Sequence, residues 1–305
     1  MAEMPMIEPA QHPMVMGAMA RLASQGGWAR MLEGKPLEDE QDVRDSELLL
    51  AARVLRRTPD GRLEPAETHP WYFDPASLAG GMLSMLRQAL HHAEGSLGGW
   101  NGADPDTIAG QGRGSAAAGR VLAESLLPLM PAAHDEFVGG RGRLLDVGVG
   151  IGALTRQLCE VYPGTTAVGI DVLDSVVDVA REELAEAGLR DQVELRVQSV
   201  VDLEDRDAFD LAWLPQVFIP PADLREGLSR VCESLKPDRW LVTPISEVSR
   251  RSDEFQRAVA DHGAHLTGGG PMSVDQMRDL LGEAGFVDVE HLDHGEQIVM
   301  LARRP

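Results

Sequence analysis

The sequence predicts an α/β fold, with a mostly parallel sheet in its second half and a mainly helical region before it. After residue 143, short apolar runs alternate with stretches of helical periodicity. These runs lack the strict polar alternation of half-exposed strands, which is typical of a parallel sheet buried on both faces. The last two runs lie too close together for a helical crossover. We therefore expect them to pair as an antiparallel hairpin at the sheet edge.

Seven segments carry the strand pattern, with helices expected between them. The expected strands are residues 143–147, 166–170, 193–197, 209–213, 240–243, 286–292 and 297–302. The expected helices are residues 153–161, 175–187, 224–235 and 274–284. Gly188 directly follows the second of these helices, and glycine commonly ends a helix because it accepts left-handed backbone.

The first part of the chain predicts helices joined by many turns. These helices are expected near residues 14–22, 45–55, 77–93 and 115–127. Pro59-Asp60-Gly61 predicts a turn, since proline presets one dihedral angle and glycine accepts the left-handed one. A helix followed by this ribbon is winged-helix-like, whereas residues 95–114, rich in glycine, are expected to form a loop. We divide the chain into a helical domain, residues 1–120, and a second domain, residues 121–305.

Charge and composition narrow the classes of partner. The net charge of -21 and the isoelectric point near 4.7 oppose binding to a phosphate backbone, so no nucleic-acid partner is expected. Two cysteines, Cys159 and Cys232, do not make a disulfide framework. No apolar run approaches the ~20 residues that span a bilayer, and the N-terminus lacks a signal-peptide pattern. We expect a cytoplasmic protein without a membrane partner.

The most informative segment is Asp146-Val-Gly-Val-Gly-Ile-Gly152, between the first expected strand and its helix. Ligands bind at the carboxyl ends of the strands in open α/β sheets, and glycine there permits close backbone approach. Dinucleotide-binding enzymes use Gly-x-Gly-x-x-Gly to seat a pyrophosphate, which differs from the spacing here. A carboxylate just before the loop also disfavours a pyrophosphate and suits an ammonium group.

Asp171 ends the second expected strand, beside the glycine loop. A carboxylate in this place accepts hydrogen bonds from ribose hydroxyls. The alternative is that Asp171 only caps the helix that follows. Its coincidence with the neighbouring glycine loop favours the ribose interpretation.

With these motifs, residues 143–304 resemble the class I S-adenosylmethionine-dependent methyltransferases. The match extends to Phe209–Trp213, to the Leu-Lys-Pro-Asp turn at 235–238 and to Leu280–Phe286. The resemblance implies a Rossmann-like, seven-stranded sheet with S-adenosylmethionine as cofactor. The N-terminal half resembles the helical or winged-helix-like extension of small-molecule O-methyltransferases, which implies a homodimer and a covered acceptor pocket.

The resemblance also implies roles for individual residues. Gly148, Gly150 and Gly152 line the methionine part of the cofactor, and Asp146 lies beneath it. The remaining cofactor contacts are Asp171 (ribose), Val172, Ser199 and Val200 (adenine), Leu214, Pro215 and Gln216 (cofactor and acceptor side), and Gln111 and Arg113 (cofactor carboxylate). Ser199 departs from the family, which often has an aspartate there, and this puts the contact to the adenine amino group in doubt.

A general base is harder to place. Many such enzymes carry a histidine just after the fourth strand, but residues 214–221 contain none. His262 and His265 are the candidate catalytic residues, in an expected loop at 261–270. Asp261 could join them as a metal ligand, but no other ligand-spaced cluster accompanies it, so no metal is expected.

The sequence therefore predicts an enzyme that transfers a methyl group from S-adenosylmethionine to a small-molecule acceptor. The expected acceptor atom is an oxygen, hydroxyl or carboxylate, of a secondary metabolite. Methylation of nitrogen or carbon on the same scaffold is an alternative. So are a non-catalytic regulatory protein that binds the cofactor and, against the glycine spacing, a dinucleotide oxidoreductase.

Overall fold

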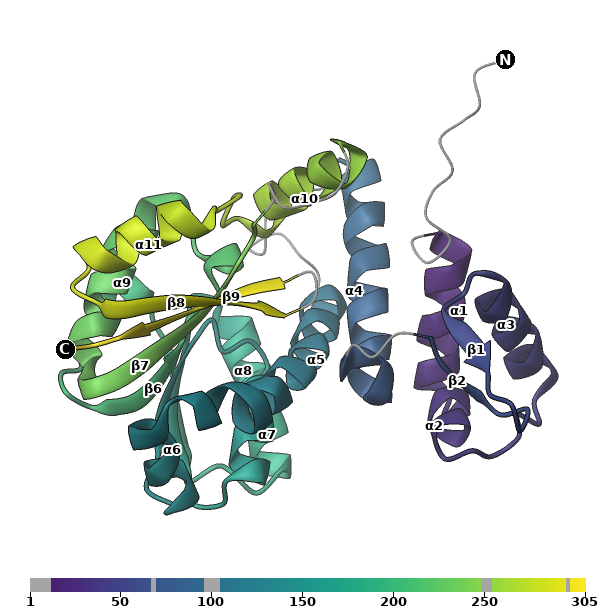
Figure 1. Ribbon diagram of the computed structural model, residues 1–305, viewed down its shortest axis with the longest axis horizontal. Coiled ribbons are helices and arrows are strands. Elements are labelled where there is room, and N and C mark those ends of the chain that lie inside the picture. The colour runs from purple at the N-terminus through teal and green to yellow at the C-terminus, as the bar shows by residue number, and fades with distance from the viewer. Residues whose placement is uncertain (1–11, 67–69, 96–104, 248–253, 295–296) are drawn as a thin grey trace. The chain divides into compact units, whose positions relative to one another are not determined.

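The computed structural model describes residues 12–66, 70–95, 105–247, 254–294 and 297–305. The chain forms two compact units (Figure 1). Unit 1 comprises Met1–Ser96 and Asp104–Ala118, and unit 2 comprises Leu97–Ala103 and Gly119–Pro305. Unit 1 is mainly helical and unit 2 contains the large sheet, so the predicted fold class is confirmed.

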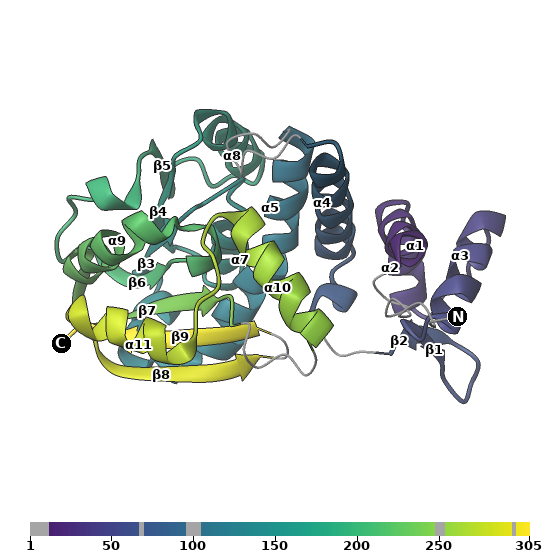
Figure 2. The ribbon, with the colours of Figure 1, turned by 90° about the horizontal axis from the view of Figure 1, so that it is seen from above.

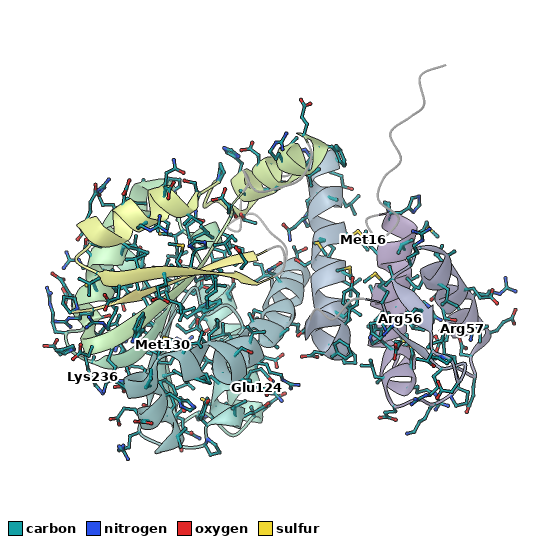
Figure 3. All side chains as sticks on the ribbon, in the orientation of Figure 1. Met16, Arg56, Arg57, Glu124, Met130 and Lys236 are labelled. Carbon is teal, nitrogen blue, oxygen red and sulfur yellow. The ribbon has the colours of Figure 1, made fainter. Side chains whose placement is uncertain are left out.

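Unit 1 packs helices with a small two-stranded sheet. Its elements are α1 (Pro13–Ser24), α2 (Gly27–Leu32), α3 (Glu40–Ala51), β1 (Leu55–Arg57), β2 (Leu63–Pro65), the 3-10 turn η2 (Pro70–Phe73), α4 (Pro75–Ala93) and α5 (Pro105–Val121), which continues into unit 2. β1 and β2 pair antiparallel, as expected for the ribbon around Gly61, and Arg56 and Arg57 on β1 are labelled in Figure 3. Trp28 is fully buried and donates through Nε1 to the Tyr72 carbonyl at 2.7 Å.

The expected loop at 95–114 is wrong in its second half, because α5 begins at Pro105; residues 96–104 lie outside the described ranges. Glycines let α4 and α5 approach closely in unit 1 (Figure 2). A Cβ added at Gly80 would lie 2.7 Å from the Gly110 carbonyl, and one at Gly114 would lie 3.4 Å from the Gly81 Cα. Close packing thus overrides the low helix propensity of glycine.

Unit 2 contains a seven-stranded sheet in the order β5-β4-β3-β6-β7-β9-β8. The strands are β3 (Arg143–Val147), β4 (Thr166–Asp171), β5 (Val193–Val197), β6 (Phe209–Trp213), β7 (Leu235–Ile245), β8 (Val287–His294) and β9 (Gln297–Arg303). β3 to β7 pair in parallel, whereas β9 is antiparallel to both β7 and β8. The predicted C-terminal hairpin is therefore confirmed.

Helices cover both faces of this sheet (Figure 1). The helical segments of unit 2 are η3 (Leu122–Leu126), η4 (Leu127–Leu129), α6 (Pro131–Val138), α7 (Ala153–Val161), α8 (Asp174–Glu186), η5 (Val200–Asp202), η6 (Gln216–Phe218), α9 (Pro221–Ser234), α10 (Glu254–Thr267) and α11 (Val274–Glu283). Leu145 and Val147 of β3 share a core with Leu228 of α9 and Met277 of α11. Because side chains alternate along a strand, Asp146 faces the other side, where α7 lies.

The expected loop at 261–270 is wrong over most of its length, because α10 runs to Thr267. Asp261, His262 and Gly263 are weak helix formers, but Ala264 is buried at 4% exposure and anchors this part of the helix. The glycine run that suggested a loop instead ends the helix. Gly268 has a φ of 95°, the left-handed conformation that commonly follows a helix C-terminus.

Both cysteines lie in the interior of unit 2. Cys159 and Cys232 are buried free thiols, and burial raises the pKa of Cys159 to about 11. In the part of the chain that the structure describes, no group of three His, Cys, Asp or Glu side chains is placed to hold a metal ion. Across the same ranges, no helix is both long and apolar enough to cross a membrane.

Candidate cofactor site

The glycine loop follows β3 and is tied to the end of β4. The Gly148 and Val149 amides donate to the Ile170 carbonyl at 2.8 and 3.0 Å. The Gly150 amide donates to Asp171 Oδ2 at 3.1 Å. These hydrogen bonds join the two neighbouring strand ends.

The three loop glycines all have positive φ, but for different reasons. Their φ values are 68° at Gly148, 56° at Gly150 and 78° at Gly152. A Cβ at Gly148 would meet only Pro215 Cγ, at 3.9 Å, and one at Gly150 would approach no other atom within 3.9 Å. A Cβ at Gly152 would lie 2.8 Å from Leu184 Cδ1. The first two glycines leave open space above the loop, and the third permits packing against α8.

Asp146 lies beneath the loop and is only 1% exposed. Its Oδ2 accepts a hydrogen bond from Thr155 Oγ1 at 2.6 Å. Burial raises the pKa of Asp146 to about 7; the Thr155 hydroxyl opposes this shift, and the charge of Asp171 adds to it. Within the described ranges, no cationic side chain forms a salt bridge with it. A ligand cation placed here would favour the ionised carboxylate.

Asp171 presents a carboxylate at the end of β4. Its Oδ1 accepts a hydrogen bond from the Leu173 amide at 3.1 Å, and its Oδ2 accepts one from the Gly150 amide at 3.1 Å. Burial raises the pKa of Asp171. Each carboxylate oxygen can accept a further hydrogen bond, so the group suits a pair of ribose hydroxyls. Val172 beside it is 60% exposed, an apolar surface of the kind that an adenine ring contacts.

The other residues predicted to contact adenine lie at the end of β5. Ser199 is half-buried and immediately precedes η5. Val200 is 5% exposed, and a Cβ at Gly227 of α9 would lie 2.7 Å from its Cγ1. Its side chain thus packs into the core, leaving its backbone to border the site. The adenine contacts of both residues stay predictions.

The segment after β6 is more deeply buried than the sequence suggested. Leu214 and Gln216 are fully buried, and Pro215 is also buried. The Gln216 side chain bonds to backbone groups of Ser246, Gly269 and Gly270. Its amide is therefore occupied within the protein, and direct cofactor contact through these three residues stays a prediction.

Gln111 and Arg113 belong to unit 1, on α5. The Ser84 hydroxyl of α4 donates to Gln111 Oε1 at 3.3 Å, and Arg113 is exposed. The candidate bases His262 and His265 are exposed on α10. His265 Nδ1 lies 2.8 Å from the Asp261 carbonyl. The predicted roles of all four residues remain untested.

Thr155 is a site residue that the sequence analysis missed. It is fully buried in the first turn of α7 and donates to Asp146. The available signal was its spacing, because a hydroxyl three residues after Gly152 lies on the first turn of a helix that begins at the loop. Such a position can face back toward the strand that leads into it.

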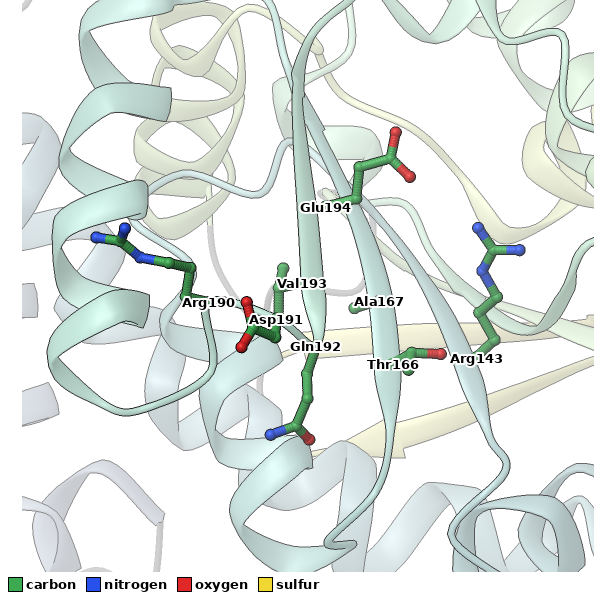
Figure 4. A pocket seen from close by; sticks show the side chains of 8 residues that line it. All are labelled: Arg143, Thr166, Ala167, Arg190, Asp191, Gln192, Val193 and Glu194. Atoms are coloured by element: carbon green, nitrogen blue, oxygen red, sulfur yellow. The ribbon is translucent and has the colours of Figure 1, made fainter.

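A separate cavity lies at the opposite edge of the sheet (Figure 4). It has a volume of about 440 Å³ and is lined by the amino ends of β3, β4 and β5, including Arg143, Thr166 and Val193. Ligands of open α/β sheets bind at the carboxyl ends of the strands. We therefore place the candidate site at the glycine loop, not in this cavity.

Comparisons with known proteins identify a family and a fold that this chain resembles. Residues 144–238 match the family described as a methyltransferase domain. Release factor glutamine methyltransferase of Gloeobacter violaceus is 28% identical over 139 residues, 44% of this chain and 46% of that protein. Nocamycin O-methyltransferase of Saccharothrix syringae is 30% identical over 170 residues, 49% of this chain and 60% of that protein. This chain spans about half the length of the curated relatives it matches.

The fold is similar over nearly the whole chain to a solved structure. The pyocyanin biosynthetic protein PhzM covers 95% of both chains with a TM-score of 0.64 and 18% sequence identity. The family match contains the glycine loop and runs from Leu144 of β3 into the start of β7. Residues 144–238 therefore match a methyltransferase domain, and nearly the whole chain shares its fold with PhzM.

Proposed function

We propose that this chain binds S-adenosylmethionine and transfers its methyl group to an oxygen of a small-molecule acceptor. One observation carries the proposal: Asp171 holds the open glycine loop through Gly150 while Asp146 lies buried below it. The open glycines can admit a ligand, Asp171 suits ribose hydroxyls, and Asp146 suits an ammonium group. The residues present therefore fit this cofactor.

The chain's residues contribute mainly by binding and orienting. When bound, S-adenosylmethionine supplies an electrophilic sulfonium methyl group for in-line displacement by the acceptor oxygen. Positioning of two reactants can contribute roughly 7 to 11 kcal/mol to such a reaction. Asp171 and the glycine loop fix the adenosine and methionine ends, and the buried segment Leu214–Gln216 excludes water beside them.

An oxygen of a secondary metabolite is the acceptor we favour. Two relatives named as oxygen methyltransferases, nocamycin O-methyltransferase and erythromycin 3''-O-methyltransferase, support this choice. A hydroxyl acceptor must lose a proton, and a base of suitable pKa assists that transfer. We propose His265 or His262 of α10 for this role. A carboxylate acceptor, which is already deprotonated, would need neither.

Calorimetric titration with S-adenosylmethionine and S-adenosylhomocysteine tests the proposal. We expect micromolar binding that weakens about a hundredfold in Asp171→Ala, or about 2.7 kcal/mol at 1.4 kcal/mol per decade. Asp178→Ala, an exposed carboxylate of α8, is the matched control and should bind normally. Absence of binding by the ligand-free wild-type chain would refute the cofactor assignment. Cofactor binding without turnover on a broad acceptor panel would favour a regulatory protein.

We also propose that the chain is a cytoplasmic homodimer. In this proposal unit 1 forms the dimer contact and helps to cover the acceptor. Exposed apolar side chains on its helices support a protein contact: Met14 on α1 is 67% exposed and Leu90 on α4 is 55% exposed. Large exposed apolar groups that gather on one unit mark interaction surfaces. Light scattering at micromolar concentration tests the dimer, and a monomeric mass would refute it.

A further inference from the structure

Three segments of unit 2 meet around the side chain of Gln216. They are η6 after β6, the end of β7 at Ser246, and the residues that follow α10. Gln216 Nε2 donates to the Gly269 carbonyl at 3.0 Å and to the Gly270 carbonyl at 3.2 Å. Its Oε1 accepts from the Ser246 amide at 3.2 Å. One fully buried side chain thus links two strand ends to the exit of a helix.

The backbone around this junction is packed too closely for other residues. The Gly269 amide donates to the Val217 carbonyl at 3.0 Å, and the Gly270 amide donates to the Ala264 carbonyl of α10 at 2.9 Å. A Cβ at Gly269 would lie only 2.2 Å from the Gln216 carbonyl oxygen. The end of α10 is therefore held directly against η6.

The chemistry of the junction selects glutamine. Two carbonyl oxygens need a donor and one backbone amide needs an acceptor, and a primary amide supplies both from one side chain. An ionised glutamate of the same size would set a carboxylate oxygen against two carbonyls. A methionine would fill the volume but leave three buried polar groups without this partner, which is costly.

We infer that Gln216 is a positioning residue that fixes α10 at the carboxyl edge of the sheet. Through α10 it sets the acceptor-side wall of the site and the placement of His262 and His265. The acceptor part of this inference rests on the proposed function, whereas the fixing of α10 does not. Gly268 and Gly270, with φ values of 95° and 69°, supply the backbone freedom that the Gln216 hydrogen bonds restrain.

Hydrogen exchange of the full chain, read by mass spectrometry over residues 254–271, tests the inference without any ligand. For Gln216→Glu we expect these amides to exchange at least about tenfold faster than in wild type near pH 8, the factor that corresponds to 1.4 kcal/mol. Near pH 5.5 the exchange rate of Gln216→Glu relative to wild type should fall, because the introduced carboxyl group, once protonated, can again donate to one carbonyl. Comparing both proteins at each pH removes the intrinsic pH dependence of exchange.

Two further variants separate a local restraint from general stability. Gln216→Met should give the same faster exchange at both pH values, since it has no titratable group. Gln157→Glu, on the surface of α7 where it contacts Glu160, is the matched control and should leave α10 unchanged. Unchanged exchange of α10 in Gln216→Met would overturn the inference. Equally faster exchange throughout β3 to β7 would also overturn it, because Gln216 would then stabilise the whole core.

Calorimetry with S-adenosylhomocysteine on the same proteins separates this inference from the proposed function. Affinity and α10 exchange are measured on the same variants, so that a change in one quantity is read independently of a change in the other. If α10 exchanged faster in the variants while the wild-type chain bound no cofactor, the proposed function would be refuted and the positioning role of Gln216 would be supported. Weakened cofactor binding with unchanged α10 exchange would place Gln216 in the cofactor site and overturn the inference.

Discussion

Two aspartates of the same sheet are equally buried but differ in their surroundings. Asp210, at the amino end of β6, accepts from Lys236 Nζ at 2.9 Å and from Arg239 Nε at 3.1 Å. It also accepts from the Arg143 amide at 3.1 Å; Lys236 is labelled in Figure 3. Asp146, at the carboxyl edge, has the Thr155 hydroxyl instead. A buried charge is normally paired. The lack of a cationic partner at Asp146 therefore supports the cofactor site proposed at the carboxyl ends of the strands.

The surroundings of Asp146 also determine the pKa of its carboxyl group. Burial raises the pKa of Asp146 to about 7, and the Asp171 charge adds to the effect. Perturbed groups of this kind gather at functional sites. In a chain with a net charge of -21, two neighbouring carboxylates at one strand edge favour a ligand that carries positive charge.

Removing the paired aspartate should have the largest effect on stability. Asp210→Ala removes the shared acceptor of Lys236, Arg239 and the Arg143 amide. Because hydrogen bonds to a charged group contribute about 1.5 to 3 kcal/mol each, we expect a loss of about 3 kcal/mol. Urea unfolding at neutral pH measures the change. The control is Asp275→Ala, whose exposed pair with Arg278 should contribute less than about 1 kcal/mol. A loss below that value in Asp210→Ala would mean that this ion cluster does not stabilise the fold.

Removing the charge of the unpaired aspartate should act in the opposite direction. The folded pKa of about 7 lies above the reference value of 3.8, so between these pH values the folded state binds more protons than the unfolded state. The free energy of unfolding therefore falls as pH rises through that window. Asp146→Asn removes this slope and should be a few kcal/mol more stable than wild type near pH 8, since each pH unit of the window corresponds to about 1.4 kcal/mol.

Urea unfolding at several pH values between 5 and 8 checks this slope, with exposed Asp178→Asn as the control. The same Asp146→Asn variant should bind S-adenosylmethionine at least about tenfold more weakly, or 1.4 kcal/mol. A gain in stability with a loss in binding would show that the buried carboxyl serves the ligand. A pH slope identical to that of wild type would contradict the buried-carboxyl argument.

The sequence predicted the sheet well because its signals are local. The strands at residues 143–147, 193–197 and 209–213 agree with the structure, since a buried parallel strand is a short apolar run bounded by turn residues. The glycine loop and Asp171 were also found from residue type and spacing. Their hydrogen bond through Gly150 is the structural expression of that motif.

The sequence failed where tertiary packing decides. Gly110 and Gly114 suggested a loop, but they allow α5 to pack against α4. The glycine run after His265 suggested a loop across residues 261–270, yet it ends a helix. The cofactor contact predicted for Gln216 stays a prediction, whereas the sequence did not reveal that its amide bonds to backbone groups far away in the sequence. Packing and hydrogen-bond partners that are distant in the sequence cannot be predicted from a local sequence pattern.

The smallest expected effects distinguish the glycines within the loop itself. Gly152→Ala places a methyl group 2.8 Å from Leu184 Cδ1 in left-handed backbone, and we expect a loss of about 2 kcal/mol. Gly188→Ala has a similar φ of 75° and no atom within 4 Å of the added carbon. It should lose only about 1 kcal/mol, so the difference isolates the Leu184 contact.

Compared with Gly152→Ala, Gly150→Ala should lose less stability and more cofactor affinity. Its backbone is also left-handed, but the added methyl group projects into the open space above the loop. We expect a stability loss of about 1 kcal/mol, as for Gly188→Ala, together with a loss of S-adenosylhomocysteine affinity larger than in Gly152→Ala. Urea unfolding and calorimetry on the three variants measure both quantities. If Gly150→Ala bound the cofactor as tightly as Gly188→Ala, the open face of the loop would not be where the ligand lies.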